Sequence, residues 1–191
     1  FLEKGRSLGL HFLEKGIFTH QTNETLSKNF VSKLIQNLSG SKNSHIDSHI
    51  NYFDGESAQV LTGAFSYVFQ KKALDKTPLD FFLPKKKLSS KVIGKCIKLA
   101  KIHGVKELRI YYAGGEDYYP CAQEGKLARI FCFESMSSKD RSFLMQLTKD
   151  FFVVRDEWGF SKAILTNVPY FYDVTEKSKH FVKDLVSLGE F

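Results

Sequence analysis

Cysteine is scarce in this chain of 191 residues, and the shortage excludes two common ways of holding a small fold together. The three cysteines, Cys96, Cys121 and Cys132, stand singly and lack the spacing of a metal site. An odd number of isolated thiols does not describe a disulfide framework either. With 42% hydrophobic residues, the chain can build a core without covalent cross-links. We therefore expect an intracellular protein, with the cytoplasm as its compartment.

Long apolar runs are also missing. No stretch approaches the roughly 18 consecutive apolar residues of a transmembrane helix, so no membrane span is predicted. Neither Gly-x-Gly-x-x-Gly nor Gly-x4-Gly-Lys-Ser/Thr occurs, which removes the usual dinucleotide and P-loop signatures. The sequence leaves open whether the protein is an enzyme and which cofactor it would use.

Carboxylates are absent from residues 85–106, which carry eight lysines. The whole chain has 28 Lys and Arg residues and 21 Asp and Glu residues, a net charge of +7. Removing the eight lysines leaves 20 basic residues against 21 acidic ones. The surplus positive charge is therefore local, and a local positive field indicates an anionic partner rather than a fold. Arginine is scarce, which argues against sequence-specific recognition of DNA.

Apolar residues at helical spacing, bounded by Ser, Gly and Pro, predict several helices. We expect them over residues 22–38, 56–73, 89–103, 138–149 and 175–188. Alternating patterns predict strands over residues 106–113 and 126–134, separated by a loop rich in Gly and Tyr. A hairpin is predicted for residues 151–155 and 161–167 around a turn at 156–159. Residues 41–51 are predicted as a loop and 79–83 as an apolar connector.

The second half of the chain therefore orders as strand, strand, helix, strand, strand, helix. This order predicts an α+β fold with an antiparallel sheet of about four strands, because hairpin-like connections join neighbouring strands antiparallel. We expect an α+β domain over residues 85–191. Residues 1–84 are expected to form a helical region, either a separate lobe or a cover on the same core.

The lysines are the first candidate for a ligand site. One group precedes the N-terminus of a predicted helix, where backbone N–H groups and the helix dipole favour an anion. A second group faces outward from that helix at helical spacing. These lysines are Lys85, Lys86, Lys87, Lys91, Lys95 and Lys98. They predict contacts to the phosphate of a small ligand, most simply a nucleotide. A solvated helix face explains the same pattern.

The loop that follows is the second candidate. Tyrosine rings can stack on a base, and glycine lets a ligand approach the backbone. The residues concerned are Tyr111, Tyr112, Gly114, Gly115, Tyr118 and Tyr119. Since neighbouring strand residues face opposite sides, only one of Tyr111 and Tyr112 can face a given ligand. Tyrosines in a half-buried sheet beside an ordinary glycine turn are the structural alternative.

Two other functions remain open. Asp117, Glu124 and Lys126 resemble the core of metal-dependent restriction-type nucleases, which implies nucleic-acid binding with possible nuclease chemistry. Trp158 in the predicted hairpin turn, together with the lysine face, would suit a protein-interaction module with an acidic partner. No metal site is predicted, because His45 and His49 lie in a polar stretch without further ligands nearby.

Overall fold

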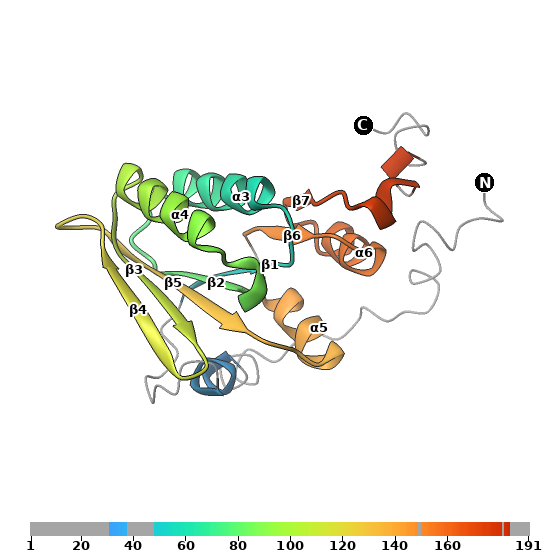
Figure 1. Cartoon of the computed structure of the whole chain (residues 1–191), viewed down its shortest axis with the longest axis horizontal. Helices are drawn as coiled ribbons and strands as arrows, with labels where there is room; N and C mark the ends of the chain where they lie inside the picture. The colour runs from blue at the N-terminus through green and yellow to red at the C-terminus, as the bar shows by residue number, and fades with distance from the viewer. Residues whose placement is uncertain (1–30, 38–47, 149, 181, 184–191) are drawn as a thin grey trace.

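The computed structural model describes residues 31–37, 48–148, 150–180 and 182–183 (Figure 1). Within them the chain builds a seven-stranded mixed sheet with helices on both faces. Residues 31–37 form a helix that precedes the first strand. The labelled elements follow in this order: β1 (His49–Phe53), α3 (Ala58–Lys71), β2 (Leu79–Pro84), η2 (Lys85–Lys87), α4 (Ser90–Ile102), β3 (Val105–Tyr112), β4 (Gly115–Pro120), β5 (Lys126–Phe133), α5 (Ser138–Leu147), β6 (Phe152–Val154), α6 (Glu157–Thr166), β7 (Tyr170–Tyr172) and η3 (Glu176–Ser178).

The strand order across the sheet is β4-β3-β5-β2-β1-β6-β7. All neighbouring pairs are parallel except β3 and β4, which form an antiparallel hairpin. β2 and β5 pair along the whole of β2, from Leu79 opposite Ala128 to Pro84 opposite Phe133. Parallel neighbours require crossover connections, and α3 supplies the one between β1 and β2.

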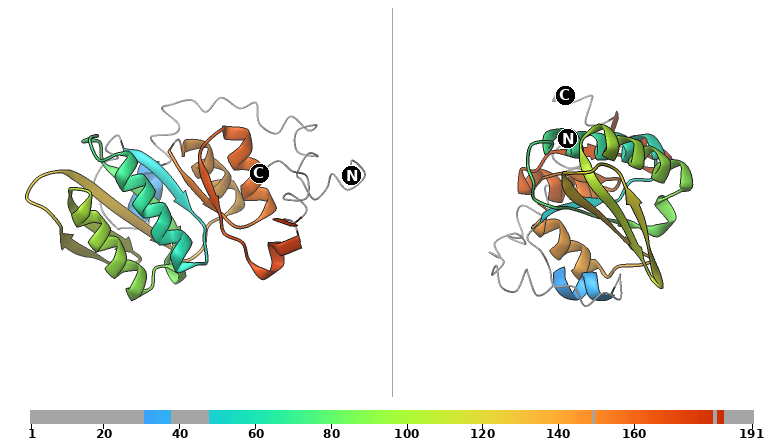
Figure 2. Two further views of the ribbon diagram at one scale, coloured as in Figure 1. Left: turned by 90° about the horizontal axis from the view of Figure 1, so that it is seen from above. Right: turned by 90° about the vertical axis from the view of Figure 1, so that its left-hand side faces the viewer.

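An apolar cluster on each face holds the helices to the sheet. α3 and α4 cover the first face side by side, while α5, α6 and the helix of residues 31–37 lie on the second (Figure 2). On the first face the rings of Phe53, Phe65 and Phe81 have centroids 4.9 to 5.3 Å apart. On the second, Phe131 stacks between Phe82 and Tyr111. Burial of the apolar surface in these two clusters, aromatic and aliphatic, stabilises the fold.

The predicted antiparallel sheet of about four strands is wrong, because the structure has a seven-stranded and mostly parallel sheet. β1 and β2, at its centre, fall in segments predicted as a loop and as a connector. Residues 79–84 are buried throughout, so the segment lacks the alternation that marks a strand with one exposed face. The sheet contains strands from both sides of residue 84.

The predicted hairpin at 151–167 is the second error. Residues 152–154 do form a strand, β6, but residues 157–166 form the helix α6. Asp156 caps this helix by accepting a hydrogen bond from the Gly159 N–H at 2.7 Å. The residues of the expected turn therefore begin a helix, and β6 pairs in the sheet with β1 and β7 instead.

The predicted loop between residues 113 and 126 is wrong in part, because it contains strand β4, which pairs with β3. Several other local predictions are confirmed. The ends of helices α3, α4 and α5 lie within two residues of the predicted ones, and so do the ends of strands β3 and β5. The expected helix at 22–38 is described only at residues 31–37, which are helical. The expected helix at 175–188 begins with the 3-10 turn η3, and its last residues lie outside the described ones. His45 also lies outside them.

Candidate functional site

The carboxyl ends of the parallel strands lie along one edge of the sheet, and charged residues follow most of them. We call this line the carboxyl edge. It is marked by Asp54 after β1, Lys85 after β2, Glu134 after β5, Arg155 after β6 and Asp173 after β7. In the sheet β1 lies between β2, which follows it in the chain, and β6, which comes much later. The strand order therefore reverses direction at β1. At such a switch in strand order the connecting loops separate, and open α/β sheets bind their ligands there.

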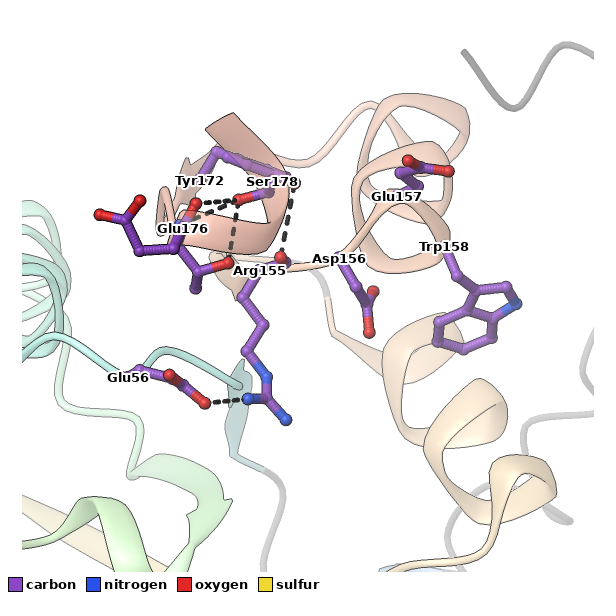
Figure 3. Close-up of a pocket in the computed structure, with 9 residues that line it drawn as sticks. Glu56, Arg155, Asp156, Glu157, Trp158, Tyr172, Glu176 and Ser178 are labelled. Carbon is purple, nitrogen blue, oxygen red and sulfur yellow. Dashed lines mark hydrogen bonds and ion pairs between the residues drawn. The ribbon is translucent and has the colours of Figure 1, made fainter. Parts of the chain in front are cut away.

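A cavity of about 790 Å³ opens at this switch point (Figure 3). Its walls come from the loops after β1, β6 and β7, so segments far apart in the chain meet around it. The volume is in the range of small-molecule sites. The lining residues are Glu56, Arg155, Asp156, Glu157, Trp158, Tyr172, Thr175, Glu176 and Ser178.

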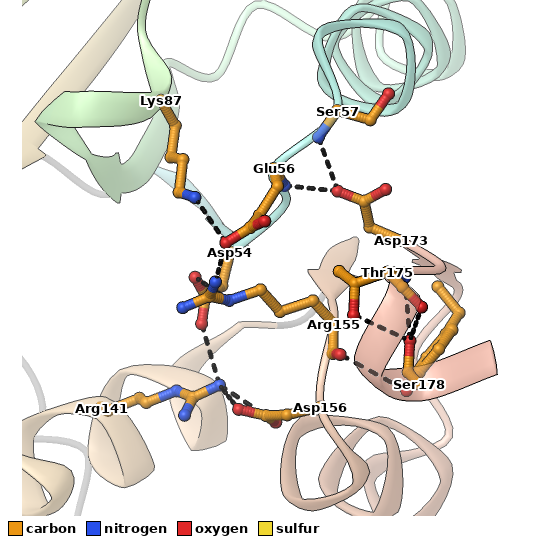
Figure 4. Close-up of polar contacts among 11 residues, drawn as sticks. Asp54, Glu56, Ser57, Lys87, Arg141, Arg155, Asp156, Asp173, Thr175 and Ser178 are labelled. Carbon is orange, nitrogen blue, oxygen red and sulfur yellow. Dashed lines mark hydrogen bonds and ion pairs between the residues drawn. The ribbon is translucent and has the colours of Figure 1, made fainter. Parts of the chain in front are cut away.

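Arg141 of α5 joins two of these loops (Figure 4). Its Nη2 donates to Asp54 Oδ2 and to Asp156 Oδ2, each at 3.0 Å. The same guanidinium lies over the ring of Trp158, 4.6 Å from the centroid. One cation therefore bridges the ends of β1 and β6 and packs against the only tryptophan of the chain at the cavity wall.

Arg155 organises a second group of charges at the same edge. Its Nε lies 3.2 Å from Asp54 Oδ1, and its Nη1 pairs with Glu56. Glu56 Oε1 also accepts a hydrogen bond from Lys87 Nζ at 2.9 Å. Through these contacts the segments after β1, β2 and β6 are tied together by alternating charges.

The N-terminus of α3 already holds an anionic group. The backbone N–H groups of Glu56 and Ser57 both donate to Asp173 Oδ2, the second at 2.7 Å. Free N–H groups and the helix dipole favour negative charge at this end of a helix. An anionic oxygen is thus accommodated by backbone groups directly beside the cavity.

The two carboxyls that hold these cations differ in protonation behaviour. Burial raises the pKa of Asp54, whose side chain is 7% exposed, although Arg141 and Arg155 act in the opposite direction. The pKa of Glu56 is lowered, because Lys87 donates a hydrogen bond to its carboxylate and adds an attractive charge. Both acids fix the positions of cations that a phosphate group would also attract.

The structure brings together only some of the predicted ligand residues. Lys85 lies 3.1 Å from Glu134 and over the ring of Tyr112, 5.6 Å from its centroid. Lys86 is exposed beside it, and Lys87 joins the charges at the cavity. Lys85, Lys86, Lys87 and Tyr112 therefore share the carboxyl edge. The turn at Ala113 and Gly114 follows directly after Tyr112 and leads to Gly115, the first residue of β4.

The remaining tyrosines lie elsewhere. Tyr111 is buried on the second face, with its ring stacked on Phe131 at 5.1 Å. Tyr118 is exposed on the edge strand β4, where the Arg109 guanidinium lies 5.4 Å from its ring centroid. Tyr119 packs against the core of the first face. These three rings do not line the cavity.

Lys91, Lys95 and Lys98 occupy the exposed face of α4, on its far side from the buried residues Val92 and Cys96. They do not line the cavity either.

The three residues of the nuclease interpretation are not brought together. Asp117 pairs with Ile110 across the hairpin and accepts a hydrogen bond from the Tyr112 hydroxyl. Lys126 pairs with Val105, five residues further toward the start of β3. At about 3.3 Å per residue, the two positions lie roughly 17 Å apart along the sheet. Lys126 is buried, and desolvation lowers its pKa.

Six charged residues of the site were not predicted from the sequence: Asp54, Glu56, Arg141, Arg155, Asp156 and Asp173. A usable signal was present, because short apolar runs end directly in charged residues at Phe53-Asp54 and at Val154-Arg155. Recognising it required reading those runs as parallel strands. Trp158, predicted in a hairpin turn, lies instead in the first turn of α6 at the cavity wall.

The sequence matches no protein-family model and no curated protein. The fold and the cavity therefore define only a class, an α/β protein with a mostly parallel sheet and a crevice at its switch point. Across the described residues, no helix is long and apolar enough to cross a membrane. In that same part of the chain, no three His, Cys, Asp or Glu side chains are grouped so that they could hold a metal ion.

Proposed function

We propose that the protein binds a nucleotide, or a closely related phosphate-bearing small molecule, at the carboxyl edge of its sheet. The main support is the cavity of about 790 Å³ at the switch point, with cations and aromatic rings in or beside its walls. This position is where open α/β sheets bind ligands. The volume is sufficient for a nucleotide.

The charges suggest how such a ligand would lie. Its phosphate would approach Arg155 and Lys87, which already hold the carboxylate of Glu56, with Lys86, whose charge also acts on Glu56, close by. Guanidinium and ammonium groups are the usual side-chain partners of phosphate oxygens. Because both cations are already held by carboxylates, little side-chain entropy is lost on binding.

The rest of the ligand would lie against the other walls. Trp158 and Tyr172 are the aromatic residues that line the cavity, so a base would pack against them in place of the tyrosines of β4. Glu157 and Glu176 offer carboxylates, which accept hydrogen bonds from ribose or other sugar hydroxyls as acidic residues do in dinucleotide sites. An entirely anionic ligand would be repelled by these acids, whereas a nucleotide places its neutral part there.

A ligand panel tests the proposal directly. We expect a nucleoside monophosphate, diphosphate or sugar nucleotide to raise the melting temperature by roughly 5–10 °C at a hundredfold excess over Kd. The same ligand should change the intrinsic fluorescence, because the only tryptophan lines the cavity. Two independent readouts then report the same binding event.

Replacing Arg155 by alanine should weaken that binding by about tenfold or more, the value of one charged hydrogen bond. Arg109→Ala is the matched control, because Arg109 contacts Glu107 and Tyr118 on β3 and β4, away from the cavity. Affinity is measured by titrating tryptophan fluorescence, and the melting temperature of each unliganded variant is measured alongside.

Absence of a response to every nucleotide would refute the proposal, as would an equal loss of affinity in both variants. Oligonucleotides belong in the same panel. If only they bind, with an affinity that falls steeply with salt, the protein is a nucleic-acid binder instead.

A further inference from the structure

The exposed face of α4 carries a line of residues that the cavity does not use. Lys91, Lys95, Lys98 and Ile102 follow one another at spacings of four, three and four residues. At 3.6 residues per turn these positions fall on one side of the helix, over a length of about 16 Å. We call these four residues the α4 stripe.

Within the part of the chain that the structure describes, the lysines of the α4 stripe have no acidic partner. Lys85 and Lys87 are paired with Glu134 and Glu56, but no ion pair joins Lys91, Lys95 or Lys98 to a carboxylate among the described residues. Lys101 and Lys106, further along the chain, are also exposed. The positive surplus noted in the sequence is therefore displayed mainly on this helix and at its C-terminal end.

Apolar side chains project at that same end. Leu74 is 99% exposed and Ile102 is 73% exposed, the highest values for large hydrophobic side chains in the described residues. Leu74 follows the C-terminus of α3, and Ile102 is the last residue of α4. The two helices pack side by side and run in the same direction, so both ends lie at the amino edge of the sheet (Figures 1 and 2).

We propose that the α4 stripe, together with Leu74, is a docking surface for an anionic lipid bilayer. Lysines at a bilayer surface are attracted by acidic headgroups, while exposed aliphatic side chains enter the interfacial layer. Neither interaction alone gives firm binding, and the combination on one surface is what peripheral attachment requires. The cavity lies at the opposite edge of the sheet and stays open to water.

Other polyanions fit this surface less well. A helix face is convex, so it cannot enclose a small phosphate compound in the way that the cavity can. Binding sites for single-stranded nucleic acid place aromatic rings between their cations. Tyr118, the exposed ring closest in sequence, lies on the other side of the sheet from α4, since its neighbour Tyr119 packs toward the helix-covered first face.

Vesicle co-sedimentation tests this proposal. We expect the protein to sediment with vesicles of phosphatidylcholine and phosphatidylserine but not with vesicles of phosphatidylcholine alone. Each lysine near an acidic bilayer strengthens binding by about fivefold, so the triple variant Lys91→Glu/Lys95→Glu/Lys98→Glu should lose roughly a hundredfold or more. The three side chains are exposed, so the melting temperature should stay close to that of the wild type.

Matched single variants distinguish an effect of the α4 stripe on vesicle binding from an effect of the net charge or hydrophobicity of the whole protein. Lys95→Glu should weaken vesicle binding severalfold, whereas Lys139→Glu on α5, with the same change of charge, should not. Ile102→Asn should weaken it as well, whereas Ile164→Asn at an exposed position of α6 should not. Equal effects within either pair would overturn the proposal, and so would binding of the wild type to an oligonucleotide but not to acidic vesicles.

Discussion

Replacing Asp80 by alanine should lower the free energy of unfolding by about 3–5 kcal/mol. Asp80 lies in β2 and is completely buried, and the Arg129 side chain beside it in β5 is 6% exposed. Two nearly parallel hydrogen bonds join them, from Arg129 Nε at 2.6 Å and from Nη2 at 2.7 Å. Removing the carboxylate leaves a guanidinium buried between parallel strands without a counter-charge.

The double variant Asp80→Met/Arg129→Met identifies the cause of that loss. Removing both charges restores an apolar interior, so most of the stability should return, as is usual when a buried ion pair is replaced by hydrophobic residues. Urea denaturation followed by far-ultraviolet circular dichroism measures all variants. If the double variant is as unstable as the single one, packing rather than the unpaired charge explains the effect.

Glu134→Ala is the control for burial, because it breaks an ion pair that is exposed. Glu134 pairs with Lys85 at 3.1 Å, but both side chains are about half exposed or more. Exposed pairs contribute at most about 1 kcal/mol, so this variant should be close to the wild type. If this variant also loses 3 kcal/mol or more of its free energy of unfolding, the loss of stability in Asp80→Ala does not depend on burial of the ion pair.

Replacing Gly125 by alanine should cost roughly 3 kcal/mol or more. Gly125 has a backbone φ angle of 130°, which residues other than glycine rarely adopt. A Cβ atom at this position would lie 2.0 Å from the carbonyl oxygen of Gly104. The obstacle is backbone at the start of β3, so it cannot be relieved by a change of rotamer.

Gly94→Ala is the matched glycine variant and should have the opposite sign. Gly94 lies within α4, and a Cβ there would meet no atom within 4 Å. Alanine in a helix interior is more stable than glycine by about 0.5–1 kcal/mol. The two unfolding curves should therefore move in opposite directions. A Gly125→Ala protein within 0.5 kcal/mol of the wild type would contradict the argument, a limit set by the usual effect of neutral surface substitutions.

Part of the site could be predicted from the sequence. The lysines 85–87 were predicted to precede a helix N-terminus, and they do form the 3-10 turn η2 directly before α4. Their contact with a phosphate group stays a prediction. The acids and arginines of the cavity were missed, because each follows a different strand. Arg141 and Asp54 are 87 residues apart, and no local pattern indicates that they share a hydrogen bond.

The sequence by itself determined the helices α3, α4 and α5 and the local surplus of lysine. Those features depend on hydrogen bonds and spacings within a few residues, which the chain displays directly. Only the tertiary structure decided that four strands lie parallel and next to one another in the order β5-β2-β1-β6. Parallel pairing joins distant residues, and strands buried on both faces lose the alternation that would reveal them. The cavity follows from that pairing, since it exists only where the loops after β1, β6 and β7 meet.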